Sequence, residues 1–406
     1  MANRKVTIVK VVASNSSNTT SGSLGVISKK LQAPSEITPL LGIAEDESLQ
    51  GNANKDVGDL KDMFASSTPC SASTIYNFGD SNSDTGGIAA AFYPPASPSG
   101  ETYFHRPAGR ASDGRLIIDF IGSNYQQGAD FATGGATIMR PNETWFQTGV
   151  SPFPLDIQVE HYTQLKDRAP FIYNQTKDEC IRKRLPKPDQ DLGKALFTID
   201  IGQNDVAFGI RTLSFELQKA AVPNIVSQFI SQVRVLYERG ARTFWVHNTG
   251  PIGCLPVATA KVKDPVAGYL DEIGCVKYQN DVALLFNKVL KEEIVKLRSE
   301  LTYAAIVYVD MYAAKYELIS HAKNQGFEDP FTTCCGYHGI DYDVYCGNKG
   351  IVNGSEVIAG SCPNPSKLIS WDGVHYTEAA NQWIANRILN GSLSNPTIAI
   401  SRACHK

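Results

Sequence analysis

Short apolar runs alternate along the chain with longer segments in which apolar residues recur every three or four positions. The short runs have the length and apolarity of buried strands and lie at 75–79, 195–201, 243–247 and 305–309. The longer segments predict helices at 116–121, 155–168, 223–238, 276–301, 313–324 and 377–390. Because helices separate the strands, this alternation predicts an α/β fold with a parallel sheet covered on both faces.

Capping and stop signals indicate where several helices begin and end. The helix at 276–301 carries its apolar residues at 283, 286, 290, 294, 297 and 301, the spacing of one packed face. Gly240 follows the helix at 223–238, as a C-terminal stop glycine does. Thr377 can cap the last helix, and Gly391 follows it.

The periodic pattern covers only part of the chain and predicts one folded domain, at 71–395. Residues 1–70 are rich in polar residues, and 1–35 contain five basic and no acidic residues, which predicts a disordered tail or a targeting segment with transit-peptide character. Residues 331–365 are rich in Cys, Gly and Tyr and are predicted to form loops. We expect 396–406 to be a short C-terminal tail.

Composition and charge narrow the possible partners. The 406 residues are 42% apolar and 19% charged, with a formal net charge of −3 and no long basic run, which argues against nucleic acid as a partner. The sequence contains no stretch of 18 apolar residues, so we expect no membrane span. We expect a monomer that acts on a small-molecule or lipid substrate.

Nine cysteines are many for a cytosolic enzyme, and they do not form paired C-x-x-C spacings. We therefore expect disulfides formed in an oxidising compartment, with one cysteine left over, and no metal site. Six glycosylation sequons fit a secreted protein, at Asn15, Asn18, Asn142, Asn174, Asn353 and Asn390.

Three polar motifs lie where strands end or helices begin. Residues 79–81 (Gly-Asp-Ser) follow the first strand, 202–205 (Gly-Gln-Asn-Asp) follow the second, and 371–375 (Trp-Asp-Gly-Val-His) precede the last helix. Open α/β sheets place their sites at the carboxyl ends of the strands, so these motifs can converge on one rim.

The convergent residues suggest nucleophilic catalysis by a serine. Ser81 can attack an acyl carbon while His375 accepts its proton, and Asp372 can hold the imidazole in the required tautomer. The oxyanion could bind the backbone N–H of Ser81, the backbone N–H of Gly134 and the side-chain amide of Asn204. Each element also has an ordinary structural use, since Asp372 and His375 can cap a helix and Asn204 can belong to a turn.

The remaining histidines offer no competing site in the sequence. His247, at a strand end, is more typical of a structural histidine than of a second base. Five others lack a carboxylate or cysteine cluster that would suggest a metal, namely His105, His161, His321, His338 and His405.

Taken together, these motifs resemble the GDSL, or SGNH, esterase/lipase family, and more narrowly its large plant group. The resemblance covers roughly residues 71–392, through segments 78–87 (FGDSNSDTGG), 109–121, 131–138, 248–256 (NTGPIGCLP), 331–337 and 371–380 (WDGVHYTEAA). It implies a three-layer, flavodoxin-like α/β/α hydrolase without a cofactor. By position, Ser81 would be the nucleophile, His375 the base and Asp372 its orienter, with Ser81, Gly134 and Asn204 forming the oxyanion hole.

Two departures from the family pattern keep alternatives open. Residues that would supply a helix end and a short second strand are missing after Ile121, which predicts a weakened sheet and a displaced Gly134. The resemblance, the cysteines and the sequons predict secretion. The polar N-terminus differs from the secretory signal of relatives, which leaves a plastid as the alternative. The leading function is a serine esterase or lipase, and the alternatives are an acyltransferase with the same triad or a catalytically impaired protein.

Overall fold

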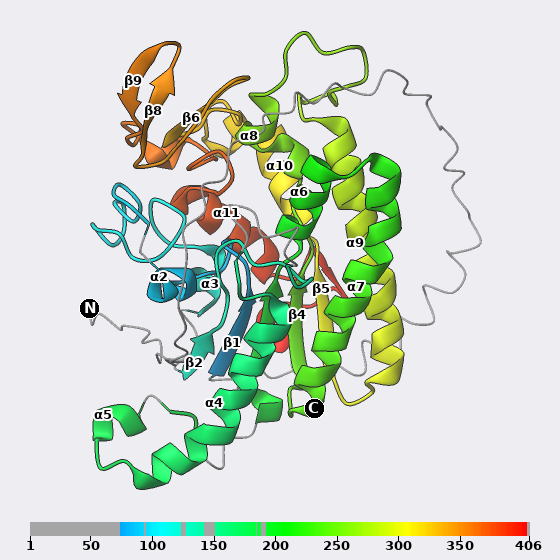
Figure 1. The fold of residues 1–406 in the computed structure, drawn as a ribbon. Helices are drawn as coiled ribbons and strands as arrows, with labels where there is room; N and C mark the ends of the chain where they lie inside the picture. The colour runs from blue at the N-terminus through cyan, green and yellow to red at the C-terminus, as the bar shows by residue number, and fades with distance from the viewer. Residues whose placement is uncertain are drawn as a thin grey trace, which may run out of the picture.

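A six-stranded sheet forms the centre of the computed structural model, which describes residues 74–92, 95–122, 127–141, 151–183, 185–187 and 192–403 (Figure 1). The strands are β1 (Thr74–Gly79), β2 (Gln127–Asp130), β3 (Leu196–Asp200), β4 (Thr243–His247), β5 (Ala305–Val309) and β10 (Ser394–Asn395). Their order is β10-β5-β4-β3-β1-β2, and only β10 runs antiparallel to its neighbour. The arrangement β2-β1-β3-β4-β5 is the flavodoxin-like strand order.

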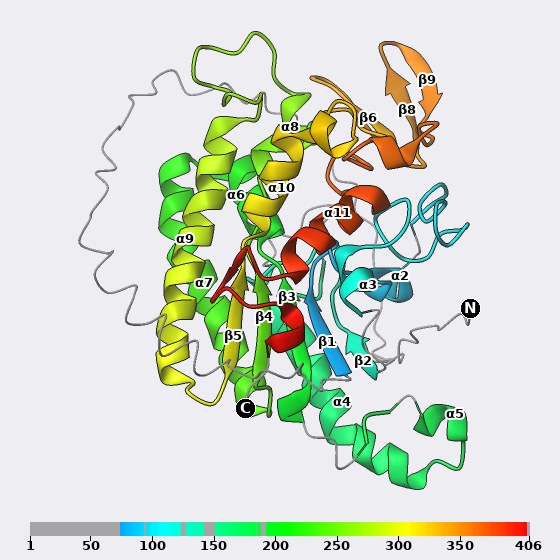
Figure 2. The same ribbon diagram turned by 180° about the vertical axis from the view of Figure 1, so that it is seen from behind.

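Every residue of β3, β4 and β5 is buried, because helices cover both faces of the sheet. On one face lie α4 (Leu155–Gln175), α6 (Gln203–Thr212), α7 (Phe215–Glu238) and α9 (Lys277–Glu300). The other face carries α3 (Ile117–Gly122), α10 (Met311–Ser320) and α11 (Glu378–Leu389) (Figure 2). The expected three-layer α/β/α fold is therefore confirmed.

The second strand is present, although the sequence predicted its loss after Ile121. Residues Gln127–Asp130 form β2, which pairs in parallel with β1 over four residue pairs, from Thr74↔Gln127 to Asn77↔Asp130. β2 lies at the edge of the sheet and pairs only with β1 among the described strands, so its four residues are enough to complete the sheet, and the central strands do not depend on it. The prediction of a weakened central sheet was wrong for this reason.

Two helices extend beyond their predicted limits, and both contain a proline. α7 begins eight residues before Pro223, where the Ser214 side chain caps the helix by accepting from the Leu217 N–H. α4 continues past Pro170 to Gln175. A proline removes one helical hydrogen bond, and the packed faces of these long helices tolerate that loss.

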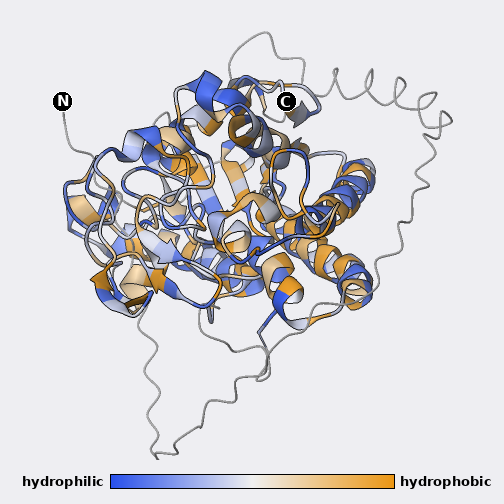
Figure 3. Cartoon of the chain, turned by 90° about the horizontal axis from the view of Figure 1, so that it is seen from above, coloured by the Kyte–Doolittle hydropathy of each residue, from blue (hydrophilic) through white to orange (hydrophobic). Residues whose placement is uncertain are grey.

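Other helix predictions agree closely with the structure. In α9 the residues at 283, 286, 290, 294 and 297 are buried, as the apolar spacing predicted. The Thr377 hydroxyl accepts from the Ala380 N–H and so caps α11. α10 begins two residues earlier than predicted, because Asp310 caps it, and it ends at Ser320 before a 3₁₀ turn. Figure 3 shows the resulting stripes of hydrophobic residues along the long helices.

The segment 331–365, predicted as loops, contains two hairpins. They are formed by β6 (Gly336–His338) with β7 (Asp343–Tyr345), and by β8 (Lys349–Val352) with β9 (Ser355–Ile358). Disulfides Cys334–Cys362 and Cys335–Cys346 tie this segment together. We call residues 331–365 the hairpin excursion.

The other described cysteines form one further disulfide, Cys254–Cys275, while Cys180 is unpaired and exposed. The prediction of disulfides is thereby confirmed; Cys70 and Cys404 lie outside the described residues. Helices and 3₁₀ turns not yet named are α2 (Gly87–Ala91), α5 (Glu179–Arg182), α8 (Pro256–Thr259), η2 (Leu192–Lys194), η3 (Ile252–Cys254), η4 (Ala322–Gln325), η5 (Pro365–Lys367) and η6 (Ile400–Arg402).

The C-terminal boundary differs from the predicted one. Ile400 and Ala403 are buried in the main core, so residues 396–403 pack with the domain instead of forming a separate tail. The predicted N-terminal tail lies outside the described residues. Among the described helices, none combines the length and apolarity needed to cross a membrane.

Candidate active site

The three polar motifs converge at the carboxyl ends of β1 and β3. The strand order reverses between these two strands, and α/β folds bind their ligands at such a switch point. The turn after β1 is fixed to β3 by the Asp80 N–H, which donates to the Asp200 carbonyl at 3.0 Å. Ser81 follows at once and is half-buried.

Ser81, His375 and Asp372 form a continuous hydrogen-bonded triad. His375 Nε2 lies 2.7 Å from Ser81 Oγ, and His375 Nδ1 lies 2.6 Å from Asp372 Oδ2. The other carboxylate oxygen, Asp372 Oδ1, accepts the backbone N–H groups of Val374 and His375 at 3.0 and 2.8 Å. The short loop before α11 therefore holds the His375 imidazole and the Asp372 carboxylate in one fixed arrangement.

The local charges favour an imidazole that readily accepts a proton. Burial alone disfavours the imidazolium, yet the Asp372 carboxylate outweighs it and raises the pKa of His375 above its ordinary value. In return, burial of Asp372 is outweighed by the charge and hydrogen bonds of His375, which hold the pKa of that carboxyl below its usual range. This mutual stabilisation is what the orienting acid of a triad supplies.

A cluster of buried charged residues lies next to Ser81. Burial and the neighbouring Asp200 raise the pKa of Asp80 to about 7, while Asn82 donates its backbone and side-chain N–H groups to Asp80 Oδ1 at 2.9 and 2.8 Å. Lys315, only 2% exposed, lies 4.8 Å from the centre of the Tyr376 ring. Asp80 raises the pKa of His375 and Lys315 lowers it, so these two charges act on the imidazole in opposite directions.

Two predicted oxyanion donors have hydrogen atoms free to bind a substrate oxygen. The Ser81 N–H donates to no residue in the described part of the chain. Asn204 Nδ2 donates one hydrogen to the Ala136 carbonyl at 2.9 Å, which leaves its second hydrogen and fixes the direction of the amide.

Gly134 is placed differently from the prediction. Its N–H donates to Asp84 Oδ2 at 2.7 Å, so a carboxylate already occupies the group expected to bind the oxyanion. The N–H of Gly135 has no acceptor among the described residues, and this residue has a φ of 79°, which favours glycine. The structure thus leaves free the N–H of the second glycine of the pair, which the sequence reading had not selected.

Two buried aspartates hold the turn that contains these glycines. Asp84 accepts the N–H of Gly86 at 2.7 Å as well as that of Gly134. Asp205, at the start of α6, accepts the N–H groups of Ile138 and Met139 at 2.8 and 3.1 Å. Burial raises the pKa of Asp205 to about 7. The motif 202–205 therefore positions the turn through Asp205 and presents the Asn204 amide.

His247, a described histidine outside the triad, pairs with a buried carboxylate. His247 Nδ1 contacts Asp200 Oδ2 at 3.0 Å, so its predicted structural use agrees with its contacts. Within the described ranges, the metal-capable group of side chains is Cys254, Asp271 and Cys275, and its two sulfurs are joined in a disulfide.

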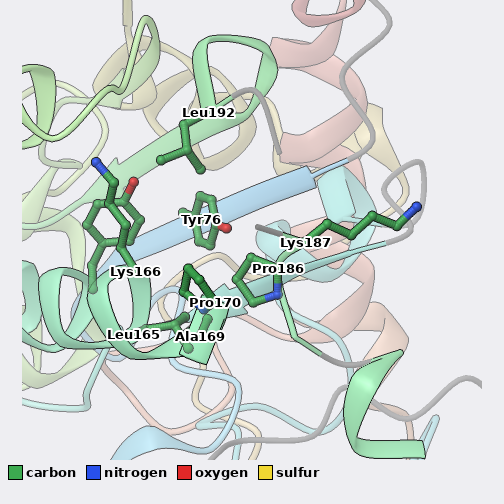
Figure 4. Close-up of a pocket in the computed structure, with 9 residues that line it drawn as sticks. Tyr76, Leu165, Lys166, Ala169, Pro170, Pro186, Lys187 and Leu192 are labelled. Carbon is green, nitrogen blue, oxygen red and sulfur yellow. The ribbon is translucent and has the colours of Figure 1, made fainter. Parts of the chain in front are cut away.

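One hollow among the described residues lies away from this chemistry. It has a volume of about 120 Å³ and is lined by Tyr76, Leu165 and Leu192, among others (Figure 4). Tyr76 lies within β1, Leu165 lies in α4, and Leu192 begins η2, the turn before β3, whereas none of the triad residues lines this hollow. We therefore assign the ester site to the triad and not to this hollow.

A serine–histidine–aspartate triad at the switch point of a flavodoxin-like sheet defines a serine hydrolase of the α/β/α class. The family model GDSL-like Lipase/Acylhydrolase matches residues 75–388. The chain belongs to this family, and it is a carboxylic ester hydrolase.

Curated plant relatives support the same conclusion. A GDSL esterase/lipase of Arabidopsis thaliana is 53% identical, over 83% of this chain and 90% of its own length. The GDSL esterase/lipase ACHE of Zea mays is 45% identical over the same shares. A protein of Hevea brasiliensis named Esterase is 45% identical, over 84% of this chain and 91% of its own.

Proposed function

We propose that Ser81 forms the acyl-enzyme through which this chain hydrolyses carboxylic esters. His375 Nε2 takes the hydroxyl proton as Ser81 Oγ attacks the acyl carbon, and then gives it to the leaving alcohol. A water molecule, deprotonated by the same nitrogen, releases the acid and restores Ser81. The hydrogen bond of 2.7 Å between Ser81 Oγ and His375 Nε2 is the observation that supports this assignment most directly.

We infer that the oxyanion is bound by the Ser81 N–H, the second hydrogen of Asn204 Nδ2 and the N–H of Gly135. Gly135 replaces Gly134 in this set because Asp84 already accepts the Gly134 N–H. Removal of one such donor costs on the order of 10²–10³ in kcat. Asn204→Ala is accordingly expected to lower kcat by about that factor with KM little changed.

The two glycines can be compared directly. An alanine at Gly134 would place its Cβ 3.2 Å from Ile88 Cγ2 at an ordinary φ, which a small shift relieves. An alanine at Gly135 would have to adopt a φ of 79°. We expect Gly135→Ala to lower kcat far more than Gly134→Ala. Equal losses of kcat would contradict the choice of Gly135 over Gly134 as an oxyanion donor.

The test of the function itself compares Ser81→Ala with Ser83→Ala on p-nitrophenyl acetate and butyrate. Ser83 lies two residues away in the same motif, is buried, and has no hydrogen-bond partner for its hydroxyl among the described residues. Ser81→Ala should reduce the rate to background, while Ser83→Ala should retain most of it. Background rates for the wild type as well would favour the catalytically impaired alternative.

Acyl transfer is the second candidate function, because an alcohol could react with the Ser81 acyl-enzyme in place of water. No feature of the site favours it over hydrolysis. Product analysis with an acyl ester and excess alcohol distinguishes the two, since a transferase yields mainly the new ester.

We further propose that the protein is a secreted, glycosylated monomer that does not bind nucleic acid. Three disulfides and the exposed sequon asparagines Asn174, Asn353 and Asn390 support the secretory route over a plastid. Asn15, Asn18 and Asn142 lie outside the described residues. Size-exclusion chromatography before and after enzymatic deglycosylation tests the assembly state and the glycans together.

A further inference from the structure

A second histidine contacts the catalytic loop from the hairpin excursion. His338, on β6, has a side chain only 1% exposed. Its Nε2 lies 2.9 Å from the backbone carbonyl oxygen of Asp372, and its Nδ1 lies 2.8 Å from Asp343 Oδ1 on β7. The ring therefore joins the excursion to the residue that orients the base.

A lysine extends this chain of contacts. Lys261 Nζ donates to the second oxygen of Asp343 at 2.7 Å and to the Gly339 carbonyl at 2.6 Å. Lys261 lies just beyond α8, so three separate segments meet around Asp343. The carboxylate is held between two nitrogen donors and cannot turn away from His338 without losing one of them.

The ring of His338 also packs directly on the backbone between Asp372 and His375. Gly373 has a φ of 89°, and a Cβ built there would lie 2.6 Å from both Cδ2 and Nε2 of His338. The loop approaches the imidazole this closely only because residue 373 has no side chain.

The partners of His338 leave little freedom in its hydrogen bonding. Nδ1 faces a carboxylate oxygen and Nε2 faces a carbonyl oxygen, and both of these are acceptors. Both acceptors lie in fixed positions on either side of the ring, so they restrict its orientation. Such a ring, fixed at both ends, is suited to holding a neighbouring loop in one position.

We propose that His338 is a positioning residue for the esterase reaction, held by Asp343 and Lys261, which fixes the backbone of Asp372 and thereby the direction of His375. This inference rests on the proposed roles of Asp372 and His375. Displacement of reacting groups by about 1 Å costs up to about 10²-fold in rate. The hairpin excursion, tied by its two disulfides, is then a support of the active site.

The test compares His338→Ala with His321→Ala. His321 is an exposed histidine just after α10, and its Nδ1 contacts the Glu317 carbonyl of that helix. On p-nitrophenyl butyrate, His338→Ala should lower kcat by about 10- to 100-fold with KM nearly unchanged. The acid limb of its kcat/KM profile should move to lower pH, because a loosened Asp372 raises the pKa of His375 less. His338→Gln, which keeps an amide donor, should restore part of kcat.

Asp343→Ala provides a second route, since Asp343 is on the surface and is partly exposed. It should lower kcat less than His338→Ala, and the double variant should be no worse than His338→Ala alone, because both act through one contact. If His338→Ala does not fold, Asp343→Ala and Lys261→Met carry the test. If the folded variants of His338, Asp343 and Lys261 keep the wild-type kcat and the wild-type acid limb of the kcat/KM profile, while Ser81→Ala is inactive, the positioning role of His338 is wrong. If Ser81→Ala is active, the proposed function itself is wrong.

Discussion

Two histidine–aspartate pairs lie at the carboxyl ends of the central strands, and they differ in what the second ring nitrogen faces. His375 and Asp372 are separated by 2.6 Å, and His247 and Asp200 by 3.0 Å, in each case from Nδ1 to Oδ2. His375 Nε2 faces Ser81 Oγ, whereas His247 Nε2 is buried without a hydrogen-bond partner among the described residues.

The comparison shows that a histidine paired with an aspartate needs a hydroxyl at its second nitrogen before it can serve as a base for a nucleophile. The His247 side chain is 4% exposed, and its Nε2 meets no hydroxyl among the described residues, so its pairing stabilises a buried carboxylate. Burial opposes ionisation of Asp200, yet His247 holds the pKa of Asp200 below its usual range. His375 is more exposed, at 16%, and its free nitrogen meets a hydroxyl in the turn after β1. The contact with Ser81 at the strand switch point therefore distinguishes the pair that we propose to be catalytic from the structural one.

The largest expected difference is between the two histidines. His375→Asn should lower kcat by about 10⁴-fold or more, because the nucleophile loses its base. His247→Asn should change kcat by less than about 10-fold, since it touches no reacting group. Steady-state kinetics on p-nitrophenyl butyrate measures both, and similar losses would make the two pairs equivalent and break the comparison.

The two aspartates should differ in the same direction. Asp372→Asn should cost about 10⁴-fold in kcat by leaving His375 in the wrong tautomer. Asp200→Asn should cost much less, although Asp200 acts on Asp80 beside the nucleophile. If Asp200→Asn were the more damaging of the two, the buried cluster would have a direct part in the chemistry.

The effects on stability should have the opposite order, with His247→Asn more destabilising than His375→Asn. His247→Asn leaves the buried Asp200 carboxylate without its partner and should lower the free energy of unfolding by about 3 kcal/mol. His375→Asn, in the more exposed pair, should cost less. Because the folded pKa of Asp200 is depressed, its stabilisation is present above the unfolded value of about 3.9 and is lost as the pH falls. Urea unfolding at pH 7 and pH 3 should therefore show the His247→Asn deficit shrinking in acid.

The smallest expected effect is on the pH profile. The base works as a neutral imidazole, and the pKa of His375 is raised, so kcat/KM should fall with decreasing pH around a midpoint above the ordinary histidine value of about 6.5. His247→Asn should leave this midpoint nearly in place. A midpoint below about 6 in the wild type would contradict the raised pKa.

Local sequence patterns were sufficient to predict the buried strands and the contact between Ser81, His375 and Asp372. The runs at β3, β4 and β5 are continuous and apolar because both faces are covered, and Ser81, Asn204, Asp372 and His375 each lie at a strand end or helix start. Their convergence followed from topology alone.

Features that depend on distant contacts were not predicted. β2 is short and polar, and it becomes a strand only by pairing with β1. Two adjacent glycines look alike in the sequence, and only Asp84, 50 residues from Gly134, distinguishes their N–H groups. His338 lies 34 residues from Asp372, so its contact with the catalytic loop depends on the folding of the hairpin excursion.

The central claim is that Ser81 carries the acyl group, and covalent labelling tests it most directly. The protein would be treated with a fluorophosphonate, and its intact mass and the labelled peptide determined alongside the Ser81→Ala and Ser83→Ala variants. We predict one adduct per chain, located on Ser81, with loss of esterase activity and no adduct in Ser81→Ala. An active enzyme that is labelled elsewhere, or that keeps its activity without Ser81, would contradict the account.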